Sequence, residues 1–165
     1  MPQTSVVSAN LSFIKTATPS GGAANATQGL SMLRNLPTGT ADGSADIGWV
    51  SLARSLTTGA TEDIDVRGAL TDAFGIAVAS VELVGLAVQS AATNTTNLTI
   101  GNGSNPLQMF FGATTHSIIL KPKDFFVWYG FAGWATTAGT ADIIKVANAA
   151  GATALYDIAF LGRSA

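Results

Sequence analysis

The stretch IAVASVELVGLAVQS (residues 76–90) decides the expected fold of this chain. Alternate residues of a β-strand point to opposite faces. From 76 to 88 both alternating sets are almost entirely apolar, and Glu82 is the one charged side chain. In a two-sheet sandwich one face of a strand contacts the core and the other usually contacts water. We therefore expect the second face of this strand to be covered, either by another part of the chain or by a neighbouring subunit.

Short runs rich in β-branched and aromatic residues continue on both sides of this stretch, from about residue 45 to the end. Clusters of Gly, Asn, Asp and Pro separate them, and none has the length and spacing of a crossover helix. This pattern predicts an all-β, antiparallel two-sheet sandwich of the jelly-roll or Greek-key type. The expected strands are 46–56, 61–68, 76–90, 96–102, 107–112, 116–122, 124–131, 141–149 and 152–162.

The first forty residues have a different composition, because the segment 16–29 is small and polar and few apolar residues flank it. We interpret residues 1–44 as an N-terminal arm or linker and residues 45–165 as the sandwich domain. The arm either reaches outward or folds back along its own domain. Leucines at spacings of three residues within 23–36 allow a short helix there. The candidate contact residues of the arm are Phe13, Ile14, Leu30, Leu33 and Leu36.

Charged residues make up 11% of the 165 residues, against about 25% in ordinary globular proteins. Interface cores are depleted in charged residues, so we interpret the deficit as surface that is buried in an assembly. A surface coated with Ser, Thr, Asn and Gly is the alternative. The candidate residues for contact with another subunit or a shell are Val84, Leu86, Val88, Phe125, Trp128, Tyr129 and Trp134.

The totals also argue against several classes of partner. A net charge of −2 provides no polybasic attraction to nucleic acid. The longest nearly apolar stretch, 74–88, is too short to cross a membrane as a helix, and the first residues lack the pattern of a signal peptide. The absence of cysteine excludes disulfides and thiolate metal sites. We therefore expect neither a nucleic-acid nor a membrane partner.

Candidate catalytic groups are few. His116 is the sole histidine, and the chain has neither a cysteine nor a Gly-x-Ser-x-Gly motif with which it could form a catalytic triad. Glu62, Asp63 and Asp65 lie close together in sequence and could bind calcium or act as acid and base. A calcium-binding loop is absent, however, and such clusters commonly protect exposed strand edges. We expect no catalytic residue, no metal site and no cofactor, and a small β-fold enzyme that uses these carboxylates is the remote alternative.

Four stretches carry a resemblance to a known family. They are GALTDAFG (68–75), NLTIGNGSNP (97–106), FFGATTHSIILKPKDFF (110–126) and ADIIKVANAAGATALYDIAFLG (141–162). Together they resemble small all-β virion structural proteins of tailed bacteriophages, namely capsid decoration or cement proteins of the jelly-roll type. The resemblance covers roughly residues 68–162. The sequence departs from the family pattern at Lys-Pro-Lys (121–123), where the pattern has Lys-Pro-Gly, and this departure is expected to change that hairpin.

The resemblance implies a non-enzymatic protein that decorates a capsid, often as a trimer that clamps neighbouring shell subunits. The expected partners are further copies of the chain, as a homotrimer, and the phage major capsid protein. The expected location is the outer surface of the virion, after synthesis in the host cytoplasm. The alternative is a receptor- or carbohydrate-binding module of a phage tail or fibre, which would use Trp128, Tyr129, Trp134 and the loop 91–105.

Overall fold

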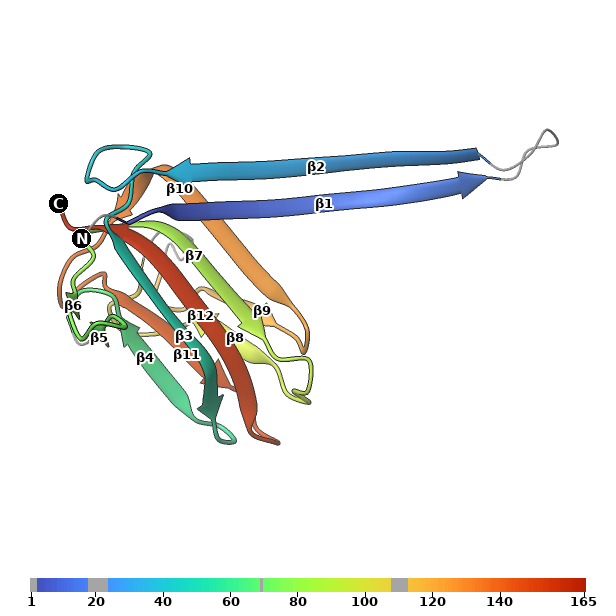
Figure 1. Cartoon of the computed structure of the whole chain (residues 1–165). Coiled ribbons are helices and arrows are strands. Elements are labelled where there is room, and N and C mark those ends of the chain that lie inside the picture. Colours follow the sequence, from blue (N-terminus) through green and yellow to red (C-terminus); the bar gives the residue numbers. More distant parts are fainter. Residues whose placement is uncertain (1–2, 18–23, 69, 108–112) are drawn as a thin grey trace.

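The computed structural model describes residues 3–17, 24–68, 70–107 and 113–165, and every regular element among them is a β-strand. Within these residues, eight strands form two four-stranded antiparallel sheets, with the orders β10-β7-β12-β3 and β4-β11-β8-β9 (Figure 1). The predicted all-β antiparallel sandwich is therefore confirmed. Most connections between these strands pass from one sheet to the other, which is compatible with a jelly roll.

The first sheet contains β3 (Ile47–Leu56), β7 (Glu82–Ser90), β10 (Phe125–Ala135) and β12 (Ala154–Arg163). The second contains β4 (Thr61–Asp65), β8 (Leu98–Gly101), β9 (Ser117–Leu120) and β11 (Ile143–Asn148). These eight correspond to expected strands. The remaining expected strand, 107–112, lies outside the described residues except for Leu107, which is buried in the core.

The hydrophobic core lies between the two sheets. The first sheet contributes Trp49, Leu86 and Phe160 to it, and the second contributes Ile64 and Ile144. The rings of Trp49 and Phe160 pack at a centroid distance of 5.4 Å. Because core residues alternate with outward-facing residues along each strand, the core also determines which side chains the outer faces present.

The expected strand 76–90 is divided into two elements. Its first part is β6 (Ala77–Val78), which pairs with β5 (Leu70–Thr71) in a small separate sheet, and its second part is β7. Between β5 and β6 the Asp72 carboxylate accepts hydrogen bonds from the backbone N–H groups of Phe74 and Ile76. This turn therefore connects β5 to β6. Sequence periodicity alone predicted that β6 and β7 form one continuous strand.

The N-terminal arm is a long β-hairpin, formed by β1 (Ser5–Ala17) and β2 (Ala24–Leu36), that projects away from the sandwich (Figure 1). The helix allowed within 23–36 was wrong, because residues 24–36 pair with β1 along their whole length. A short helix that contains Gly29 has little intrinsic stability, whereas the strand satisfies its backbone groups through this pairing. We refer to β1 and β2 as the arm.

The root of the arm packs onto the outer side of the first sheet. Leu36, Ala45 and Val84 form a small buried cluster there, and Tyr129 and Leu161 pack against it. The arm is therefore joined to the sandwich by apolar contacts as well as by the connecting loop. This cluster covers only the end of the sheet that is nearest to the arm.

The Lys-Pro-Lys turn keeps the backbone conformation that glycine favours, although the chain has no glycine there. Lys123 has φ of 75°, and the Asp124 backbone N–H donates to the Lys121 carbonyl at 3.0 Å. A positive φ at the third residue of a turn, after Pro, is typical of a type II turn. In this chain Lys123, and not a glycine, therefore occupies the position of positive φ in the turn.

Candidate association surface

The outer face of the first sheet is mostly apolar, and beyond the root of the arm the polar residues of its two central strands are Gln89 and Asp157. Antiparallel register places Val127, Ala87, Ala159 and Val50 side by side in one row across its four strands. Leu52 and Phe125 are each 69% exposed at the two edge strands. Only about 60% of a typical exposed surface is apolar, and contiguous apolar patches are usually functional. We call the surface formed by Val50, Ala87, Phe125, Val127, Asp157 and Ala159 the outer apolar face.

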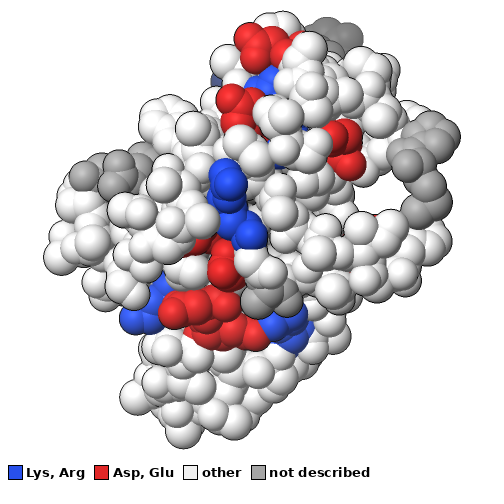
Figure 2. Space-filling view, turned by 90° about the vertical axis from the view of Figure 1, so that its left-hand side faces the viewer, with Lys and Arg blue, Asp and Glu red and all other residues white. Residues whose placement is uncertain are grey.

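The opposite side of the sandwich is different. Figure 2 shows it, and there side chains of both charges gather near the middle of the face. Asp63 and Lys145 are cross-strand neighbours on β4 and β11, where their neighbours Ile64 and Ile144 point into the core. Such a mixed charged face is ordinary solvated surface. The two sides of the sandwich therefore differ in polarity, and the outer apolar face is the less charged of the two.

The two faces of the arm also differ. On the face that continues from the packed root, Leu11 and Leu30 are register partners, and Phe13 and Met32 flank them. All four side chains are more than half exposed. The other face carries Val6, Ile14 and Leu33 among polar residues. We call the first of these two faces the root-side face of the arm.

A groove of about 420 Å³ lies where the arm meets the sheet. Its floor contains small residues, among them Gly85, Ala87 and Ala159, and its walls include Val7 and Val127. Small residues on a sheet permit close approach of another backbone. The groove joins the root-side face of the arm to the outer apolar face, so the two surfaces are continuous.

Several of the predicted contact residues are not available at the surface. Leu86 and Val88 point into the sandwich core, and Val84 is buried under the root of the arm together with Leu36. As residues that contact another chain, Val84, Leu86 and Val88 were wrong predictions, whereas Leu36 makes an arm contact with its own domain, as the fold-back alternative required. The second apolar side of 76–88 is thus covered in part by another part of the chain. This was one of the two expected explanations, the other being cover by a neighbouring subunit. Phe125 and the arm residues Phe13, Ile14, Leu30 and Leu33 are exposed.

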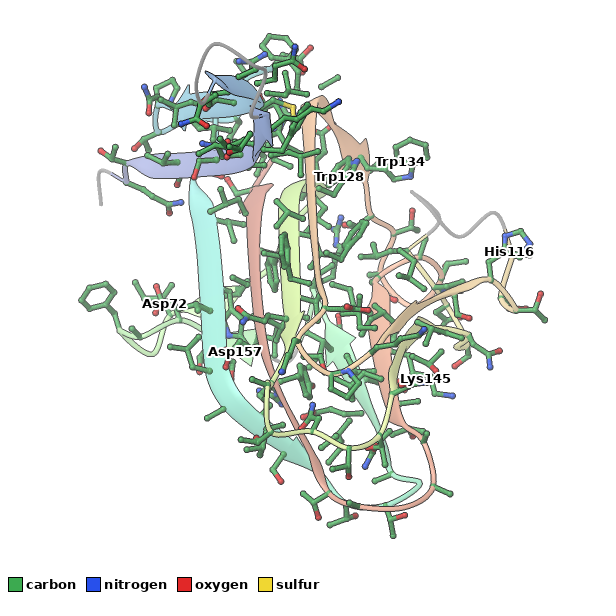
Figure 3. The ribbon with its side chains drawn as sticks, turned by 90° about the vertical axis from the view of Figure 1, so that its right-hand side faces the viewer. Asp72, His116, Trp128, Trp134, Lys145 and Asp157 are labelled. Carbon is green, nitrogen blue, oxygen red and sulfur yellow. The ribbon has the colours of Figure 1, made fainter. Side chains whose placement is uncertain are left out.

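The aromatic residues Trp128, Tyr129 and Trp134 do not share one surface. Trp128 packs against the sandwich core, whereas Tyr129 packs on the opposite side of β10 against the arm root. Trp134 lies beyond an irregularity in the pairing of β10 with β7 and is 44% exposed (Figure 3). In the expected loop 91–105, the Asn94 side chain is engaged with the Leu155 backbone. No flat platform of these three rings is available for stacking a sugar.

The carboxylates of β4 have separate structural contacts. Glu62 forms an ion pair with Arg54 and accepts a hydrogen bond from the Tyr156 hydroxyl at 2.6 Å. The guanidinium of Arg54 beside Glu62 holds the pKa of that carboxyl below its ordinary value, while burial raises the pKa of the Tyr156 hydroxyl. Asp65 accepts the backbone N–H of Arg67 at 2.8 Å. The geometry thus gives Glu62 and Asp65 structural roles, one between strands and one in the turn after β4.

Replacing Glu62 with Gln is expected to remove part of the pH dependence of stability. Because folding lowers the pKa of Glu62 from 4.5, its ionisation stabilises the fold above that value and ceases to do so as pH falls through the folded-state pKa. The free-energy advantage of the wild type over the variant should therefore be largest above about pH 5 and shrink in acid. Urea unfolding at a series of pH values measures this, and a constant difference would contradict it.

His116 lies in an exposed turn before β9, and its backbone N–H donates to the Ala113 carbonyl at 3.1 Å. Among the described residues no group of three or more His, Asp or Glu side chains is placed to hold a metal ion. The same residues contain no helix that is long and apolar enough to cross a membrane.

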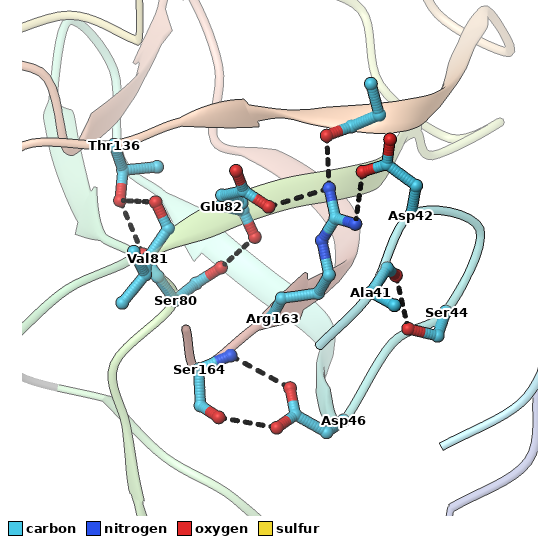
Figure 4. Close-up of polar contacts among 11 residues, drawn as sticks. Ala41, Asp42, Ser44, Asp46, Ser80, Val81, Glu82, Thr136, Arg163 and Ser164 are labelled. Atoms are coloured by element: carbon cyan, nitrogen blue, oxygen red, sulfur yellow. Dashed lines mark hydrogen bonds and ion pairs between the residues drawn. The ribbon is translucent and has the colours of Figure 1, made fainter. Parts of the chain in front are cut away.

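Arg163 fixes the arm root to the sandwich. Its guanidinium is buried and forms ion pairs with Asp42 of the loop after β2, at 3.0 Å, and with Glu82 of β7, at 2.7 Å (Figure 4). It also donates to the Ala132 carbonyl on β10. The Arg163 side chain thus connects the loop after β2, β7 and β10 at the root of the arm.

Sequence reasoning missed the contribution of β3 to the outer apolar face, as well as Arg163. A signal for β3 was present, because the run 46–56 has apolar residues at both alternations: Trp49 on one face, Val50 and Leu52 on the other. Arg163 had no such signal, because its partners are distant in sequence. Comparison of the chain with models of known protein families finds no match, and comparison with curated proteins finds none.

Proposed function

We propose that this chain is a non-enzymatic virion subunit of a tailed bacteriophage, namely a capsid decoration or cement protein. In this proposal it self-associates as a homotrimer on the outer capsid surface and bridges neighbouring major capsid subunits. A protein that binds the assembled shell but not its dissociated subunits stabilises the shell by mass action. Its task is then adhesion, which requires complementary surfaces and no catalytic group.

The observation that carries the proposal is the continuous apolar surface of the arm and the first sheet. An isolated two-stranded hairpin is at best marginally stable in water. This arm nevertheless extends over strands of 13 residues each and leaves Leu11 76% exposed. Covering such a surface with protein removes the cost of its hydration. The low overall charge and the sequence resemblance give further support.

The tail or fibre module, the alternative function, has less support. Its expected binding residues Trp128, Tyr129 and Trp134 lie on different surfaces of β10. A stacking site for sugars needs at least one accessible aromatic face with polar groups around it. The decoration role is therefore the better explanation of this geometry.

Light scattering after size exclusion and co-sedimentation with capsids test the proposal together. The full chain is expected to elute with the mass of three copies and to sediment with empty, expanded capsids of the phage that encodes it. A variant with Leu11→Asn and Phe13→Asn should lose oligomer mass, whereas Ile119→Asn, on the outer side of the other sheet, should not. A folded monomer that stays in the supernatant would exclude the proposal.

A further inference from the structure

We infer that the outer apolar face of one copy receives the arm of a second copy, with the root-side face of that arm against the sheet. The inference rests on the self-association in the proposed function and names the surfaces that form it. It assigns the arm to another copy of the chain in preference to the shell.

The arm cannot cover its own sheet beyond the root. Its packed root covers the row formed by Tyr129, Gly85 and Leu161, and from there the arm projects away from the sheet, toward the viewer in Figure 3. The next row, from Val127 to Val50, stays uncovered. A second arm laid on this row would extend the apolar contact that the first arm begins. It would bury both unpartnered surfaces at once.

The charges of the two surfaces are complementary. Lys15 and Arg34 are the charged residues of 1–36, a segment with no acidic residue, and both lie on the root-side face of the arm. All ten Asp and Glu residues lie in 37–165. On the outer apolar face, Asp157 accepts a hydrogen bond from the Ala53 backbone N–H at 2.7 Å and has no ion-pair partner among the described residues. Opposite charges on two apolar surfaces favour this pairing.

The dimensions limit the size of one such contact. Strands of 13 residues at about 3.3 Å per residue make the arm about 43 Å long, whereas a row across four strands about 4.8 Å apart spans about 19 Å. About half of one arm therefore lies on the sheet of its partner and buries on the order of 500 Å² in total, so a stable oligomer needs more than one such contact. In a closed ring each copy both gives and receives an arm, so each copy takes part in two such contacts.

Cysteine crosslinking tests this contact directly, because the chain has no cysteine of its own. One tagged copy carries Leu11→Cys on the arm, and a co-expressed copy with a different tag carries Val127→Cys on the outer apolar face. A short bis-maleimide is expected to give the mixed dimer as the main crosslinked product. The matched control replaces Val127→Cys with Ile119→Cys, an exposed apolar position on the other sheet, and should give little mixed dimer.

The other outcomes overturn the inference in distinguishable ways. Crosslinks only between two Leu11→Cys copies would mean that arms pack on arms. Equal crosslinking to Ile119→Cys would mean that the contact is not specific. An oligomer without any crosslink would mean that the arm does not contact the sheet of another copy and remains available to a shell partner. In these three cases the proposed function stands while the arm–sheet contact fails. A monomer by light scattering would remove both.

Discussion

Replacing Asn148 with alanine is expected to destabilise the fold by about 3 kcal/mol or more. The Asn148 side chain is buried, and the two N–H groups of its amide are shared among the carbonyl oxygens of Leu56, Thr57 and Ala152, at N–O distances of 2.8 to 3.0 Å. Its oxygen accepts the Thr96 hydroxyl at 2.7 Å. Alanine would leave several of these groups without a partner, and each unsatisfied buried group costs about 1–3 kcal/mol.

The matched control is Asn97→Ala, which removes the same side chain from an exposed position nearby. Surface substitutions of this kind usually change stability by less than about 0.5 kcal/mol. Thermal unfolding at one fixed protein concentration should show a drop on the order of 10 °C for Asn148→Ala and little change for Asn97→Ala. Equal effects of the two substitutions would show that water replaces the lost contacts of Asn148.

The importance of Asn148 could not be predicted from its sequence position, because most of its partners lie in segments that are distant in sequence. The same reason applies to Arg163 at the arm root. The three carbonyl partners of Asn148 come from the last residue of β3, the turn that follows it and the turn after β11, and Thr96 comes from the loop before β8. Periodicity describes which face a residue takes within one strand, but contacts between turns depend on how the sheets are assembled. The sandwich was therefore predictable, while its polar supports were not.

The same limit explains the errors at the predicted contact surface. Alternation in 76–88 indicated that the second side of this run is covered, and the chain itself covers part of that side at Val84. Alternation could not tell which side of β7 faces the core. Leu86 and Val88 therefore looked available and are core residues. The arm shows the opposite error, because local spacing of leucines suggested a helix and pairing with a distant strand decided the structure. Non-local pairing is the information that a single strand pattern lacks.

Replacing Glu82 with alanine is expected to cost about 2–3 kcal/mol, more than the equivalent change at Asp42. Both carboxylates pair with Arg163, whose side chain is 1% exposed, but Glu82 is 32% exposed and Asp42 is 61% exposed. Without Glu82 the buried guanidinium keeps only the solvent-screened Asp42 and the Ala132 carbonyl as partners. Without Asp42 it keeps its better shielded pair, so Asp42→Ala should cost less than about 1 kcal/mol.

A double variant decides whether the buried charge is the cause. Breaking an ion pair by removing one partner leaves an uncompensated buried charge, whereas replacing both partners with apolar groups is often nearly neutral. Adding Arg163→Met to Glu82→Ala should therefore recover part of the stability lost in the single variant, as measured by urea unfolding. If the double variant is instead less stable than Glu82→Ala, the hydrogen bond of Arg163 to Ala132 and its packing at the arm root contribute more than its charge pairing with Glu82. The first outcome would mean that the stability lost in Glu82→Ala comes from the unpaired buried charge of Arg163.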